Sequence, residues 1–104
     1  MRRNKRETNR IVIQKIIAYC NDIEDFRSRV NASYEIYLSN KMFRMAVDFS
    51  VYQIGELTTR FSEDFKAQHS EIPWHEIKGL RNIHAHDYER VNTEIIGVIK
   101  NQLN

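Results

Sequence analysis

Residues 41–68, KMFRMAVDFSVYQIGELTTRFSEDFKAQ, are the longest stretch of the chain with helical periodicity, and they decide the fold. The apolar side chains recur every three or four residues, as in an α-helix, and fall into two stripes. The first stripe is Phe43, Val47, Ile54, Leu57, Phe61 and Phe65, and the second is Met42, Met45, Ala46, Phe49 and Tyr52. One continuous helix would be roughly 40 Å long, more than one side of a small domain can cover. The second stripe therefore fits either contact with a second copy of the chain or a central place in a monomeric bundle.

Four further helices are predicted around this stretch, over residues 8–28, 32–38, 74 onward and 93–103. The first carries an apolar seam made of Val12, Ile16, Tyr19, Ile23, Phe26 and Val30. Asn31 and Asn92 are predicted N-caps, because a side-chain oxygen there accepts from the first free backbone N–H groups. Pro73 ends the preceding segment and starts the next helix at Trp74. We expect an all-α, up-and-down helical bundle of four main helices plus a short one.

Composition limits the classes of protein that this chain can be. Its 104 residues have room for one domain, and 41% apolar with 29% charged residues is typical of a folded, water-soluble chain. The three glycines stand apart, so they cannot form a glycine-rich phosphate loop, and the single Cys20 excludes an internal disulfide. No signal peptide or membrane-length apolar run is present, which predicts a cytoplasmic protein.

The first residues are strongly basic, although the net charge is only +2. We interpret residues 1–9 as a flexible basic arm on a single domain that covers residues 1–104. Such an arm could follow a phosphate backbone or simply be a solvated chain end. The remainder is slightly acidic, so a nucleic-acid site in it must be small and local.

The segment 79–90, GLRNIHAHDYER, concentrates the chemically active side chains. His84 and His86 resemble the paired histidines of some zinc hydrolases, but two residues that are two apart on a helix point in nearly opposite directions. We therefore expect no metal and no cofactor. The plain structural alternative is a polar turn in which Arg81 forms a surface salt bridge and both imidazoles are solvated.

Metal-free cleavage of RNA needs few groups. An imidazole can accept and return protons near neutral pH, and a guanidinium can stabilise negative charge on phosphate oxygens. The ribose 2′-hydroxyl serves as the nucleophile, so DNA would not be cut. Two proton transfers favour two imidazoles, which a twofold dimer could bring into one composite cleft.

Arg81, His86 and Tyr88 have the spacing Arg-x₄-His-x-Tyr, which resembles the signature of the HepT-like branch of the HEPN superfamily. The lead-in Ile72-Pro73-Trp74 and the central Ile54-Gly55-Glu56 are also similar to that family. The resemblance covers about residues 10–103 and implies a metal-independent ribonuclease toxin of a type VII toxin–antitoxin module, with an all-helical HEPN-type fold and a homodimeric active cleft. It further implies an MntA-like nucleotidyltransferase antitoxin as partner. The alternative role within the same superfamily is a non-catalytic subunit that helps a nucleotidyltransferase recognise its substrate.

The resemblance assigns roles to individual positions. Arg81 would stabilise the phosphate, His86 would be the general acid and base, and Tyr88 would receive AMP from the antitoxin. Asn82 would orient groups in the cleft. The additional His84 would either share the proton transfers or have no part in catalysis. An AMP group on Tyr88 would place a phosphate near Arg81 and block the site.

Four other residues are interpreted as structural. We expect His69 and His75, which lie outside the motif, to be structural or solvated. Glu56 is expected to form a buried hydrogen bond, and Cys20 is expected to lie in the core.

Overall fold

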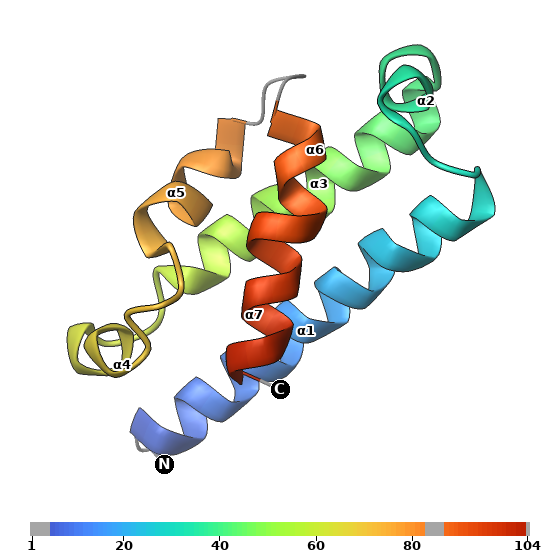
Figure 1. Cartoon of the computed structure of the whole chain (residues 1–104). Coiled ribbons are helices and arrows are strands. Elements are labelled where there is room, and N and C mark those ends of the chain that lie inside the picture. The colour runs from blue at the N-terminus through green and yellow to red at the C-terminus, as the bar shows by residue number, and fades with distance from the viewer. Residues whose placement is uncertain (1–4, 83–86, 104) are drawn as a thin grey trace.

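The computed structural model describes residues 5–82 and 87–103, and every regular element in those ranges is helical, which confirms the predicted all-α fold. The elements are α1 (Lys5–Arg29), α2 (Tyr34–Ser39), α3 (Lys41–Thr58), α4 (Glu63–Gln68), α5 (Trp74–Gly79), the 3₁₀ turn η1 (Leu80–Asn82), α6 (Tyr88–Arg90), the π-helical segment η3 (Val91–Ile96) and α7 (Gly97–Leu103). The long helices α1 and α3 pack along each other, and the continuous α6–η3–α7 helix crosses them (Figure 1). None of the described helices is long and apolar enough to cross a bilayer.

Helix α1 begins earlier than the sequence predicts. It already includes Lys5, the first described residue, so residues 5–9 of the predicted arm are helical, and residues 1–4 lie outside the described part of the chain. Glu7 lies near the N-terminal end of the described helix, where a negative charge is stabilised by the helix dipole. The predicted seam is confirmed at Val12, Ile16 and Ile23, which are buried in the core.

Helix α3 ends at Thr58, so the prediction of one helix over residues 41–68 is wrong. The Thr58 and Thr59 hydroxyls donate to the carbonyls of Gly55 and Glu56, and the Ser62 side chain caps α4 by accepting from the Phe65 N–H at 3.1 Å. These local bonds give the backbone an alternative to continuing the helix. Helix α3 is therefore about 27 Å long at 1.5 Å per residue.

The short helix α2 is capped by Ser33, whose hydroxyl accepts from the Ile36 N–H, rather than by the predicted Asn31. Asn31 instead takes the left-handed conformation with φ of 50° just beyond α1, a role that asparagine tolerates better than most residues. At the other end of α2, Arg44 donates to the carbonyls of Tyr37 and Leu38, which fixes the short helix on α3.

The last helix begins at Tyr88 rather than at residue 93, and Asn92 lies inside the π-helical segment instead of capping a helix. Its inward side chains, Val91, Ile95, Ile96 and Ile99, are all buried. Lys100 ties this helix to α1 through its bonds to Asn21 and Glu24, at 2.9 and 3.0 Å. The burial of Tyr88 and Val91 explains the early start, because core contacts outweigh a local capping signal.

Candidate functional site

Arg81 lies in the η1 turn that follows α5, and two bonds hold its side chain. Its Nη1 lies 2.6 Å from Oε1 of Glu56 on α3, and its Nε donates to the Lys78 carbonyl at 3.2 Å. The two charged side chains are 39% and 40% exposed, so the guanidinium reaches solvent while its stem is fixed. A surface pair of this kind contributes only about 0–1 kcal/mol to stability, and its larger effect is on the direction of the guanidinium.

Gly55, beside Glu56 on α3, makes room for the same arginine. A Cβ at position 55 would lie 2.8 Å from Cγ of Arg81 and 3.0 Å from the Ile77 carbonyl oxygen. A glycine inside a helix costs about 0.5–1 kcal/mol relative to alanine. Here that cost accompanies the close approach of α5 and the Arg81 stem to α3.

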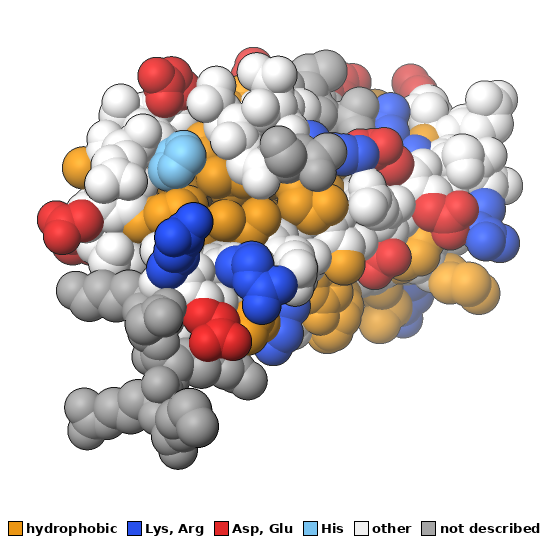
Figure 2. All heavy atoms as spheres, turned by 90° about the horizontal axis from the view of Figure 1, so that it is seen from below, with side chains coloured by type: hydrophobic (Ala, Val, Ile, Leu, Met, Phe, Trp, Pro, Cys, Tyr) orange, Lys and Arg blue, Asp and Glu red, His pale blue; other side chains and the backbone are white. Residues whose placement is uncertain are grey.

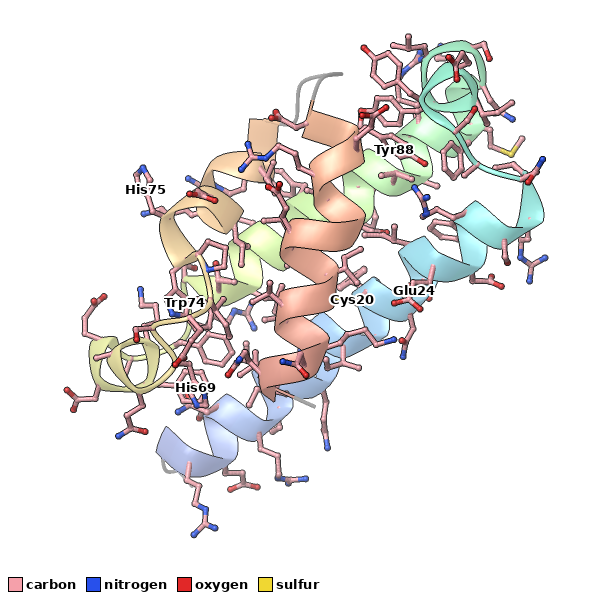
Figure 3. The ribbon with its side chains drawn as sticks, in the orientation of Figure 1. Cys20, Glu24, His69, Trp74, His75 and Tyr88 are labelled. Carbon is pink, nitrogen blue, oxygen red and sulfur yellow. The ribbon has the colours of Figure 1, made fainter. Side chains whose placement is uncertain are left out.

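Tyr88, the first residue of α6, is buried and 3% exposed. Its ring stacks on Tyr37 of α2 with centroids 4.5 Å apart, and it meets Phe43 edge-on at 6.0 Å. Its hydroxyl accepts a 2.5 Å hydrogen bond from Nη1 of Arg27 near the end of α1. Figure 3 shows Tyr88 directed from the start of α6 toward this end of α1 and α2.

Tyr37, which stacks on Tyr88, donates a hydrogen bond from its hydroxyl to Oδ1 of Asp48 at 2.5 Å. Burial raises the pKa of Tyr37 above its usual range, and the bond to Asp48 raises it further. Burial also raises the pKa of the Asp48 carboxyl, against the lowering effects of the Tyr37 hydroxyl and the Arg44 charge. The pKa of Tyr88 is raised by burial too, although Arg27 opposes that shift. Both phenols are therefore neutral at physiological pH.

The structure separates the surroundings of the predicted site residues. Arg81 contacts Glu56 and α5, whereas Tyr88 contacts Arg27, Tyr37 and Phe43, so the two share none of these partners. His84 and His86 lie outside the described residues, as does the side chain of Asn82. The roles of these three residues remain predictions.

The other residues singled out from the sequence take structural places. His75 is exposed on α5, while the His69 ring lies against Phe65 at 4.5 Å, and the His69 carbonyl accepts from the Trp74 indole (Figure 3). Cys20 is a core residue as predicted, and burial raises the pKa of its thiol to about 12. Glu56 forms the expected hydrogen bond but is half-exposed rather than buried.

Sequence reasoning missed Arg27 and Asp48. Arg27 lies 61 positions from Tyr88, one helical turn after the buried Ile23 on α1, and no motif connects the two. Asp48 interrupts the apolar pattern of α3, which was the only available signal that a buried polar partner faces it.

A family model described as ribonuclease HepT-like matches residues 16–104. The chain belongs to the HepT-like ribonuclease family. No solved structure matches this HepT-like chain significantly.

Three relatives of this HepT-like chain illustrate the similarity. A protein of Methanocaldococcus jannaschii, named as a candidate RNase, is 36% identical over 73 residues, which is 70% of this chain and 65% of that protein. Another candidate RNase, from Caldanaerobacter subterraneus subsp. tengcongensis, is 32% identical over 91 residues, covering 86% and 79%. The protein named probable ribonuclease HepT in Thermococcus cleftensis is 32% identical over 74 residues, covering 71% and 66%. The chain thus spans just under two thirds of the Methanocaldococcus and Thermococcus relatives.

Helix α3 of this HepT-like protein also carries an exposed apolar stripe, which we call the α3 stripe: Met42, Met45, Phe49 and Tyr52, with exposures from 45% to 82%. The spacing of three, four and three residues keeps these side chains on one face, and four residues further along that face lies Glu56. The α3 stripe therefore leads directly to the Glu56–Arg81 pair.

Charge is mixed on the face of the HepT-like molecule that Figure 2 shows. Positive and negative side chains lie among apolar ones there, without a continuous basic area. A nucleic-acid site on this face would have to be local.

Proposed function

We propose that this HepT-like protein is a metal-independent endoribonuclease toxin that uses Arg81 and His86. The His86 imidazole accepts the proton of a ribose 2′-hydroxyl, and the 2′-oxygen then attacks the adjacent phosphorus. The bond from phosphorus to the 5′-oxygen breaks, and that oxygen takes up a proton. The products carry a 2′,3′-cyclic phosphate and a 5′-hydroxyl. Arg81 stabilises the charge that develops on the phosphate oxygens.

The observation that carries this proposal is the presentation of Arg81. The Arg81 side chain is 39% exposed, so its guanidinium can reach a phosphate. Its bonds to Glu56 and to the Lys78 carbonyl fix the orientation of the guanidinium before a phosphate binds. Two of its five N–H donors serve these bonds, and the remaining donors can meet phosphate oxygens. Asn82 directly follows this arginine and His84 lies three positions after it, and we assign both supporting roles in the cleft.

We propose that the active form is a homodimer that packs through the α3 stripe. Four large apolar side chains on one helical face exceed the scattered exposure of an ordinary monomer surface. The stripe carries no charge, so two identical copies can pack there without like-charge repulsion. Because Glu56 follows the stripe on the same helical face, the second copy would lie beside Arg81 and could supply the second imidazole.

The proposed partner is an MntA-like nucleotidyltransferase that transfers AMP to Tyr88. In this step the Tyr88 oxygen attacks the α-phosphorus of ATP, pyrophosphate leaves and the phenol loses its proton. Since Tyr88 is 3% exposed and its oxygen is bonded to Arg27, it must leave its pocket before it can react. An AMP group would then prevent its return, which would hold residues near the motif in a changed position.

The test is RNA cleavage by purified protein in the presence of EDTA, with the cyclic phosphate end as readout and DNA of the same sequence as control. Arg81→Ala and His86→Ala should each abolish cleavage while the helical content stays unchanged. Cleavage that persists in both variants would overturn the assignment. A folded wild-type dimer that cuts no RNA but stimulates a nucleotidyltransferase would instead indicate the non-catalytic subunit.

A further inference from the structure

The strongest unassigned feature is the way two adjacent residues of α3 enclose one side chain of α5 and η1. Gly55 lies against the aliphatic stem of Arg81, and Glu56 binds its guanidinium. The Lys78 carbonyl binds the Nε of the same arginine from the preceding turn. Three neighbouring groups therefore fix the stem and two donors of the residue proposed to stabilise the phosphate.

Gly55 sets where the stem lies. A methyl group there would come within 2.8 Å of Arg81 Cγ and 3.0 Å of the Ile77 carbonyl oxygen, and the second of these is backbone that cannot rotate away. Any larger side chain would push α5 and Arg81 away from α3. By contrast, a Cβ added at Gly79 would meet nothing within 4 Å. The requirement for glycine therefore belongs to position 55 and not to glycines of this region in general.

Glu56 sets where the guanidinium points. The 2.6 Å bond uses a donor of Nη1, and the bond to Lys78 uses the Nε–H, so the plane of the fork is defined by bonds at two of its nitrogens. Because both side chains are about 40% exposed, the pair adds little to folding stability. Its effect is on geometry, where a displacement of about 1 Å can cost about a hundredfold in rate.

We propose that Gly55 and Glu56 are positioning residues for Arg81, which rests on the proposed ribonuclease function. The alternative is that Glu56 only neutralises Arg81 and competes with the RNA phosphate. The two cases predict opposite changes in the rate of RNA cleavage when Glu56 is removed. Removing a competing carboxylate would raise kcat/KM, whereas removing a positioning group lowers kcat and leaves KM unchanged or lower, because a negative charge next to the phosphate is gone.

The experiment compares Glu56→Ala, Glu56→Gln, Gly55→Ala and Gly79→Ala by steady-state RNA cleavage, with Arg81→Ala as the inactive reference. We expect Glu56→Ala to lower kcat about tenfold or more without raising KM. Glu56→Gln keeps an oxygen acceptor at the same distance and should recover most of the wild-type kcat. Gly55→Ala should lower kcat, and Gly79→Ala should match the wild type. Circular dichroism and light scattering verify fold and mass.

The outcomes separate this inference from the proposed function. If Arg81→Ala still cuts RNA at the wild-type rate, the ribonuclease assignment fails. If Arg81→Ala is inactive while Glu56→Ala keeps the wild-type kcat or exceeds it, the assignment stands and the positioning role is wrong. Should Gly55→Ala fail to fold, the comparison of Glu56→Ala with Glu56→Gln decides alone: equal loss in both variants would also overturn the positioning role.

Discussion

The Arg27 guanidinium donates to the Tyr88 hydroxyl at 2.5 Å, and its Cζ lies 5.3 Å from the centre of the Tyr88 ring. This contact joins the end of the first helix to the start of the last one. It fixes the tyrosine of the motif against Tyr37 and Phe43, in a place that solvent barely reaches. The residue proposed to be modified is therefore also a core residue.

Substitutions of Tyr88 should separate these two roles. Tyr88→Phe keeps the stacked ring and loses only the bond to Arg27, so we expect a loss of about 1–2 kcal/mol in the free energy of unfolding. Tyr88→Ala empties the space between Tyr37 and Phe43 and should cost about 3–5 kcal/mol. Urea denaturation followed by circular dichroism measures both. Equal losses in the two variants would show that the ring is not packed as described.

Release of the Tyr88 hydroxyl should speed its modification. Arg27→Ala removes a charged hydrogen bond, and with the cognate nucleotidyltransferase and ATP we expect AMP incorporation to be about tenfold faster by intact-mass spectrometry. Arg29→Ala is the matched control, because Arg29 pairs with Asp25 on the same helix and both side chains are exposed. Equal rates in both variants would mean that the Arg27 bond does not limit access to Tyr88.

The half-buried carboxyl of Asp48 should make stability depend on pH. Because its pKa is raised in the folded state, the folded chain holds this proton more tightly than the unfolded chain does. Its contribution is favourable at acidic pH and is lost as pH rises through the raised pKa. The stability of Asp48→Asn relative to the wild type should therefore increase from pH 3 to pH 7. Asp64→Asn, on the exposed side of α4, controls for the loss of one negative charge. A difference that stays flat with pH in Asp48→Asn would contradict this expectation.

A charge in the α3 stripe should disrupt the proposed dimer. Phe49 is 58% exposed, so Phe49→Lys should leave the monomer folded while placing two like charges in the contact. Sedimentation velocity should show a dimer for the wild type and for Ala67→Lys, an exposed control on α4, and a monomer for Phe49→Lys. We expect RNA cleavage to fall with the dimer. A dimeric, fully active Phe49→Lys would exclude this face as the interface.

The thiol of Cys20 should be inert in the folded protein. It is fully buried, and its pKa is raised to about 12, so the reactive thiolate is scarce at pH 8. Ellman's reagent should react with one thiol per chain in guanidinium chloride and with almost none under native conditions. Fast labelling of the native chain would mean that α1 opens locally.

Much of the fold was predictable because burial follows helical spacing. The seam of α1 and the inner stripe of α3 lie where the apolar periodicity placed them. The break after Thr58 was not predictable from that periodicity, since Phe61 and Phe65 continue it while threonine and serine hydroxyls interrupt the backbone. The start of the last helix at Tyr88 was not predictable either. Asn92 is a residue type that favours helix N-caps, but it lies inside this helix, because core contacts of the preceding residues extend the helix toward Tyr88.

The sequence predicted only those residues of the candidate site that lie within a short, continuous motif. The motif identifies Arg81 and Tyr88, and the Gly55–Glu56 pair is similar to the family. The contact of Glu56 with Arg81 crosses 25 positions and that of Arg27 with Tyr88 crosses 61. Such pairs depend on how helices pack, which side-chain spacing along one helix does not determine.

The π-helical segment after Tyr88 controls which way that tyrosine faces. Its wide turn holds one residue more than an α-helical turn, and this offset is compatible with Tyr88 before it and Ile96 and Ile99 after it all being buried in the same core. Deleting one residue between Val91 and Ile96 would restore regular winding and rotate the preceding turn by about 100°, carrying Tyr88 out of phase with Tyr37. The orientation of the motif is thus encoded partly in the length of the segment that follows it.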